Sequence, residues 1–116
     1  LIDARPEDQY VGINRHPTAT ESGTIEGAKN LPNGWITVNG GGEFRNKAQL
    51  EQLHKVANVP TSGEQINFCN TGHWASVGWF ASSELLGNKK ARMYDGSMVE
   101  WTMLKGGSMD QKVKLQ

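Results

Sequence analysis

Cys69 is the side chain of this sequence best suited to nucleophilic chemistry, and it is the chain's one cysteine. It directly follows a predicted strand over residues 65–68, and a helix is predicted over residues 74–86. In an open parallel sheet, ligands bind beyond the carboxyl ends of the strands. The position of Cys69 therefore predicts a site at that end of a sheet.

The polar segment between this strand and this helix is suited to holding an anion. Gly72 allows a tight turn, including backbone with positive φ. Such a loop can point several backbone N–H groups at one centre, and the helix dipole adds to their effect. These groups would stabilise a thiolate, which is the reactive form of cysteine, and then a persulfide anion or a departing group.

Inert interpretations of the same residues remain open at this stage. A lone cysteine after an apolar strand is often a core residue, and only the glycine-bearing loop and the helix favour catalysis. His73 is either a solvated loop residue or a proton-transfer group. Trp74 either packs beneath the loop or forms an aromatic wall for the substrate.

The elements that must position Cys69 are short strands alternating with helices. Strands are predicted at residues 1–4, 28–31, 65–68 and 91–94, and a helix is predicted at 46–57 with Leu50, Leu53, Val56 and Ala57 on one face. A helical turn is expected at 7–10, a loop at 14–23 and apolar packing at 99–104. This alternation predicts a parallel α/β sheet. We expect one domain over residues 1–104 and a C-terminal tail over 105–116, poorly ordered from 106 onward.

Composition narrows the class of protein. Lys plus Arg and Asp plus Glu both number 12, so the zero net charge gives no electrostatic signature for nucleic acid or an anionic membrane. No apolar stretch is long enough to span a bilayer, so we expect no membrane partner. A single cysteine excludes an internal disulfide and a multi-cysteine metal site. We expect neither metal nor cofactor, and the compartment, cytoplasmic or periplasmic, is not fixed.

Four motifs resemble those of the rhodanese-like sulfurtransferases. The loop from Cys69 to Ala75 resembles the family's C-x-x-G-x-x-A active-site loop, and the segment from Tyr94 to Trp101 is similar to its Y-D-G-S-W-x-E-W signature. Residues 1–5 resemble its L-I-D-x-R strand, and residues 23–30 resemble its G-H-I-P-G-A-x-N turn. The four motifs occur in the family's order. They are most similar to the C-terminal catalytic domain of tandem-domain thiosulfate and 3-mercaptopyruvate sulfurtransferases.

The resemblance implies a fold, a reaction and a set of site residues. The fold is α/β, with a central parallel sheet and helices on both faces. The reaction moves sulfur from a donor such as thiosulfate to cyanide or a thiol, through a persulfide on Cys69. The expected substrate-binding residues are Asn70, Thr71, Gly72, His73, Trp74 and Ala75, with Arg45 as an incoming cation or a solvated surface residue. Residues expected to orient the loop are Asp3, Arg5, Asp95 and Ser97.

The sequence departs from the family in its charges. Asn70 and Thr71 stand where thiosulfate-using enzymes carry Arg and Lys, and Gln9 replaces another Arg. Each lost cation removes a charge-assisted contact worth about 1.5–3 kcal/mol, so weak binding of thiosulfate is expected. A strand and helix that usually precede the L-I-D-x-R strand are absent. We therefore expect a partner, a second rhodanese-like domain or chain from the same precursor.

Two other classes of protein compete with this interpretation. A phosphatase or arsenate reductase of the same fold needs Arg six positions after the cysteine, where this chain has Ala75. A non-catalytic interaction or sulfur-carrier domain needs no turnover, and retention of Cys69 with Gly72 disfavours a pure scaffold.

Overall fold

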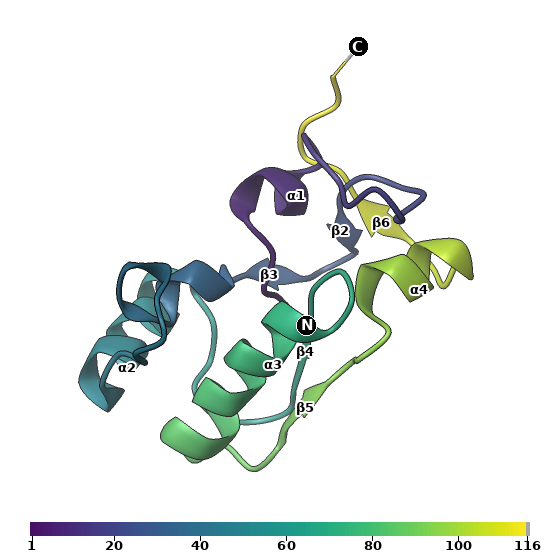
Figure 1. Cartoon of the computed structure of the whole chain (residues 1–116). Coiled ribbons are helices and arrows are strands. Elements are labelled where there is room, and N and C mark those ends of the chain that lie inside the picture. The colour runs from purple at the N-terminus through teal and green to yellow at the C-terminus, as the bar shows by residue number, and fades with distance from the viewer. Residues whose placement is uncertain (116) are drawn as a thin grey trace.

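The computed structural model, which describes residues 1–115, contains a four-stranded parallel sheet with helices packed around it (Figure 1). Its strands are β1 (Ile2–Asp3), β3 (Lys29–Asn30), β4 (Gln65–Phe68) and β5 (Ala91–Met93), in the order β3-β1-β4-β5. The predicted parallel α/β sheet is confirmed, and β4 has the predicted bounds. Because β1 is an inner strand, Cys69 at the end of β4 lies next to the end of β1.

The two faces of the sheet carry separate apolar clusters. Ile2 pairs with Asn67, and Asp3 pairs with Phe68. Because side chains alternate along a strand, the first pair points to one face of the sheet and the second pair points to the opposite face. On the face of Ile2 lie α2 (Lys47–Val56), α3 (His73–Phe80) and the π-helical turn η3 (Ala81–Leu85). On the face of Phe68 lies α4 (Ser97–Met103), which buries Met98 there. Helices thus lie on both faces.

The helix α2 begins at a capping box and buries only part of its predicted apolar stripe. The Asn46 side chain accepts from the Gln49 backbone N–H at 2.9 Å, and the Gln49 side chain accepts from the Asn46 N–H at 3.1 Å. Leu50 is fully buried, as predicted. The prediction for Val56 is wrong, because this side chain at the helix end is 68% exposed, and His54 is buried instead.

The helix after Cys69 begins at His73 and continues through η3 up to Gly87, whose φ of 77° suits a helix end. In α4 the expected packing of 99–104 is only partly correct. Thr102 is buried, and Val99 and Trp101 are half-buried, whereas Met103 and Leu104 are 63% and 67% exposed. A helix beginning at Ser97 turns these two apolar residues to solvent.

The predicted disorder of the C-terminal tail is wrong for residues 109–110. There, β6 (Met109–Asp110) pairs antiparallel with β2 (Thr24–Ile25), a strand that sequence analysis missed. Gly23 has a φ of 99°, and a Cβ there would lie 2.3 Å from the Asp110 carbonyl oxygen, so only glycine fits this close approach. The last residue of the predicted tail, 116, lies outside the described residues.

The remaining elements connect these layers. The helix α1 (Glu7–Val11) follows β1, and the 3-10 turns η1 (Asn33–Trp35) and η2 (Val38–Gly40) lead from β3 toward α2. Among the described residues, no helix has the length and apolar character needed to cross a bilayer. Beside the outer strand β5 lies an apolar hollow of about 370 Å³, lined by Leu1, Ile25, Ile66, Arg92, Met93, Tyr94 and Trp101.

Candidate active site

Cys69 lies at the floor of a small cleft beyond the carboxyl end of β4. The thiol is buried, with 1% of the residue exposed. The cleft measures about 220 Å³ and is lined by His16, Cys69, Asn70, Thr71, His73 and Trp74. Five of these six residues belong to the predicted loop. The sixth, His16, comes from the loop between α1 and β2.

The loop backbone turns back onto the sulfur at Gly72. Its N–H donates to the Sγ of Cys69 at 3.1 Å, and its φ is 100°. A Cβ at this position would lie 2.6 Å from Oδ1 of Asp95 and 2.8 Å from the Asp95 carbonyl oxygen. Glycine is therefore required both by the backbone conformation and by the close approach of Asp95. The helix α3 begins immediately afterwards, at His73.

The turn between β5 and α4 holds the loop from the other side. Oγ of Ser97 accepts from the Cys69 backbone N–H at 2.9 Å and donates to the Tyr94 carbonyl at 2.8 Å. The same hydroxyl lies 3.9 Å from the Cys69 sulfur. The N–H groups of Met98 and Val99 donate to the carbonyls of Cys69 and Asn70 at 2.9 and 3.0 Å. The structure thus brings the predicted Asp95 and Ser97 against the loop.

Tyr94 opens this turn, and its hydroxyl donates to Glu100 at 3.0 Å. Burial raises the pKa of Tyr94, and the hydrogen bond to Glu100 and the charge of that carboxylate raise it further. The phenol therefore stays protonated and keeps its donor role.

Asp3 and Arg5 form a fully buried ion pair beneath the site. Nη2 of Arg5 lies 2.7 Å from Oδ2 of Asp3 and donates to the Gly23 carbonyl at 2.6 Å. Thr24 Oγ1 donates to the same carboxylate at 2.8 Å. The pair connects the end of β1 to the turn before β2. Neither side chain lines the cleft, whereas Ala4 between them packs against Cys69 and Ala75.

Two polar side chains in the cleft are fixed by neighbours outside it. Asn70 is 3% exposed, and its Nδ2 donates to Oε1 of Gln9 at 2.8 Å. Nδ1 of His16 accepts from the Thr18 backbone N–H at 3.1 Å. His16 was not among the site residues predicted from the sequence. The one feature that could have indicated it is the position of His16 in the loop before the turn of residues 23–30.

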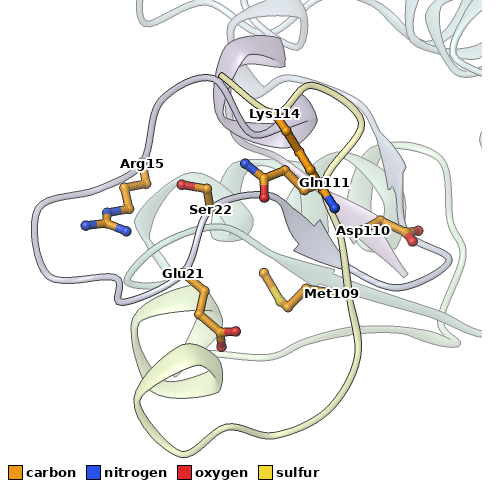
Figure 2. Close-up of a pocket in the computed structure, with 7 residues that line it drawn as sticks. All are labelled: Arg15, Glu21, Ser22, Met109, Asp110, Gln111 and Lys114. Carbon is orange, nitrogen blue, oxygen red and sulfur yellow. The ribbon is translucent and has the colours of Figure 1, made fainter. Parts of the chain in front are cut away.

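Neither Arg45, the cation expected from the sequence, nor Arg15, the neighbour of His16 in the chain, lines the cleft. Arg45 donates from Nε to the Trp35 carbonyl at 2.6 Å and is not among the lining residues. Arg15 borders a separate, larger hollow of about 620 Å³ between its loop and the C-terminal segment (Figure 2). In Figure 2, side chains of both charge signs surround this hollow without meeting at one point. Within the described residues, no Lys or Arg lines the Cys69 cleft.

A cysteine held by a backbone N–H at the start of a helix, beyond a parallel strand, defines a thiol-centred site of an α/β domain. The family model of the rhodanese-like domain matches residues 1–104. The chain belongs to this family, and the resemblance seen in its four motifs is confirmed.

Curated relatives agree with the family. A Haloferax volcanii protein named "Putative thiosulfate sulfurtransferase" is 33% identical over 96% of this chain and 40% of its own length. The "Sulfur carrier protein TtuD" of Thermus thermophilus is 32% identical over 91% of this chain and 39% of its own length. The chain thus spans about 40% of the length of these curated relatives. These relatives support a protein of the sulfurtransferase kind.

Solved structures agree with the fold. The Tum1 protein from Saccharomyces cerevisiae superposes with a TM-score of 0.78 at 27% identity, over 97% of this chain and 40% of that chain. A structure of an EanB variant with a cysteine persulfide and ergothioneine superposes with a TM-score of 0.83 at 20% identity, over 97% of this chain and 28% of that chain. The rhodanese-like fold, with its central parallel sheet, is therefore established.

Proposed function

We propose that this domain transfers a sulfane sulfur from a donor such as thiosulfate to cyanide or a thiol, through a persulfide on Cys69. The observation that carries the proposal is the contact of the Gly72 N–H with Sγ at the floor of the cleft. A backbone N–H directed at Sγ stabilises the Cys69 thiolate before the reaction and the negatively charged persulfide after it. The names of the curated relatives support the same chemistry.

The reaction proceeds in two displacements. The Cys69 thiolate attacks the outer sulfur of thiosulfate, a new S–S bond forms, and the old S–S bond breaks with its electron pair on sulfite. The acceptor then attacks the outer sulfur of the Cys69 persulfide and releases the thiolate. The enzyme ends each cycle unchanged, so no external oxidant or reductant is needed.

The other residues of the site serve this step by position. Thr71, His73, Trp74 and Asn70 line the space above the sulfur and would contact the donor. Ala75 packs against Cys69, and Ser97 fixes its backbone N–H. The ion pair of Asp3 and Arg5 would hold the end of β1 beside the loop.

Mass spectrometry of the intact protein tests this proposal directly. Treatment with thiosulfate should add one sulfur atom to Cys69, and cyanide should remove it as thiocyanate. The Cys69→Ser variant, which changes a single atom, should gain no sulfur. A wild-type protein that gains no sulfur from any sulfane donor would exclude the proposed function.

A carrier role is the second candidate, and the name of the Thermus relative favours it. A carrier would form the same persulfide but pass it to a protein thiol instead of turning over with a small acceptor. The rate at which loaded Cys69 gives up its sulfur, measured with cyanide and with a protein thiol, separates the two roles. An enzyme for small acceptors should give up its sulfur faster to cyanide, whereas a carrier should give it up faster to the protein thiol.

The hollow beside β5 is the docking place that we propose for the partner expected from the sequence. There Met93 is 36% exposed, and Nε1 of Trp101 is buried without a hydrogen-bond partner. A second rhodanese-like domain or chain from the same precursor would cover this hollow and its exposed apolar side chains. The greater length of the relatives supports such an occupant.

The mass of the native protein in its source cells, and the rate at which Met93 is oxidised there, test for this partner. A complex larger than 12.7 kDa, with Met93 protected from mild oxidation compared with the isolated chain, is expected. A protein of 12.7 kDa that oxidises at Met93 as fast as the isolated chain would rule the partner out.

A further inference from the structure

Among the described residues, none that lines the cleft above Cys69 carries a permanent positive charge. The lining consists of a thiol, an amide, a hydroxyl, an indole and two imidazoles. Arg45 is engaged with the Trp35 carbonyl, and Arg15 borders the separate hollow of Figure 2. A donor that carries a second negative charge would therefore leave water for a site without a fixed counter-charge, which is unfavourable.

The imidazole of His16 lines this cleft, and its Nδ1 is occupied by neighbouring groups. A backbone N–H can only donate, so the 3.1 Å contact from Thr18 makes Nδ1 of His16 an acceptor. In the neutral ring the hydrogen then sits on Nε2. The Thr18 hydroxyl, 2.7 Å from the same Nδ1, strengthens this arrangement. His16 thus offers a single N–H in place of the cationic fork of an arginine.

Asn70 brings an amide to the lining instead of a cation. Its amide nitrogen is occupied by Gln9 at 2.8 Å. Its Oδ1 is buried and has no hydrogen-bond partner. An unpaired carbonyl oxygen disfavours a neighbouring oxyanion, because both are hydrogen-bond acceptors. Asn70 therefore supplies neither a counter-charge nor a free amide N–H to a doubly charged donor.

The walls of the cleft suit an organic group. The half-buried ring of Trp74 provides an apolar surface, and Trp74 packs against Cys69 and its apolar neighbours. The volume of about 220 Å³ equals that of about seven waters at about 30 Å³ each. This space accommodates a small apolar group beyond the transferring sulfur.

From these observations we infer that the donor is an organic sulfane compound with one negative charge, such as a thiosulfonate, in preference to the thiosulfate dianion. This inference rests on the proposed function and specifies the donor class of the same site. For an arenethiosulfonate, the Cys69 thiolate attacks the outer sulfur, the S–S bond to the sulfonyl group breaks, and the sulfinate leaves with the electron pair. The arene lies against Trp74, and Nε2–H of His16 meets a sulfonyl oxygen.

Benzenethiosulfonate and thiosulfate form a matched pair of probes, because the first replaces one charged oxygen of the second by a phenyl group. We would measure the second-order rate of sulfur loading on Cys69 by rapid quench and mass spectrometry. Each rate is divided by the rate of the same donor with a free low-molecular-weight thiol. After this correction, benzenethiosulfonate should exceed thiosulfate by about tenfold or more, since one charge-assisted contact is worth about 1.5–3 kcal/mol.

Two variants identify the cause of the preference. Thr71→Lys should raise the thiosulfate rate and reduce the corrected ratio about tenfold, whereas Thr71→Met, of similar length and no charge, should not raise it. Trp74→Ala should lower the benzenethiosulfonate rate more than the thiosulfate rate.

The outcomes separate this inference from the proposed function. A corrected ratio at or below one, with both donors loading Cys69, overturns the organic-donor inference and leaves the sulfurtransferase proposal standing. An equal effect of Thr71→Lys and Thr71→Met overturns the charge argument. Absence of loading by either donor overturns both proposals.

Discussion

Replacing Gly72 by alanine is the sharpest perturbation of the loop that holds Cys69. At a φ of 100°, an L-residue costs about 1–3 kcal/mol in backbone strain alone. The added Cβ would also lie 2.6 Å from Oδ1 of Asp95 and 2.8 Å from its carbonyl oxygen. The carbonyl belongs to the backbone and cannot rotate away, so the loop must shift. We expect the free energy of unfolding to fall by about 2–4 kcal/mol in total.

Gly27→Ala is the matched control for this experiment. Gly27 also has a positive φ, of 84°, but a Cβ there would meet nothing within 4 Å. Urea unfolding of both variants separates strain from clash, and sulfur loading reports the N–H contact to Sγ. We expect Gly72→Ala to be the less stable variant and to load sulfur at least about tenfold more slowly, as is typical for removal of one aligned donor. Equal stability of the two variants, with full loading by Gly72→Ala, would refute the role given to this loop.

Three further variants test other parts of the structure. Arg5→Met leaves Asp3 as an unpaired buried carboxylate, so urea unfolding should show a loss of about 3–5 kcal/mol, and a loss below about 1 kcal/mol would contradict the buried pair. Burial lowers the pKa of His54 in the folded protein, although its hydrogen bond to Leu50 acts in the opposite direction. At a pH below the ordinary histidine pKa, the unfolded chain therefore binds more protons than the folded protein. Stability of the wild type should therefore fall as pH decreases from about 7 toward 5, and His54→Gln should reduce this slope; an unchanged slope contradicts the assignment. Ser97→Ala leaves the buried N–H of Cys69 without its acceptor and should destabilise by about 1–3 kcal/mol with slower loading, whereas wild-type values for both would show that Ser97 does not hold the site.

The parts of the fold that could be predicted are those specified by local sequence. The short run before Cys69 is bounded by turn residues, and it forms β4 with the expected limits. In helix α2 the apolar spacing correctly predicts the burial of Leu50. In the last turn of this helix Val56 is exposed and His54 is buried. A periodic pattern cannot distinguish these two neighbours at a helix end, because only packing decides which side is covered.

The missed features depend on contacts between distant segments. The strand β6 forms because Met109 and Asp110 reach back to β2, and nothing in their own sequence indicates a strand. His16 enters the cleft because a long loop folds over the sheet end, a placement that its neighbours in sequence do not encode. By contrast, Asp95 and Ser97 were predicted to face the loop because their motif was recognised as a unit.

Peptide mapping of the loaded protein tests most directly whether Cys69 carries the transferred sulfur. After reaction with a sulfane donor and removal of excess reagent, the peptide containing Cys69 should carry one additional sulfur, which cyanide removes with one equivalent of thiocyanate. Sulfur found on no peptide, or retained by the Cys69→Ser variant, would contradict the account.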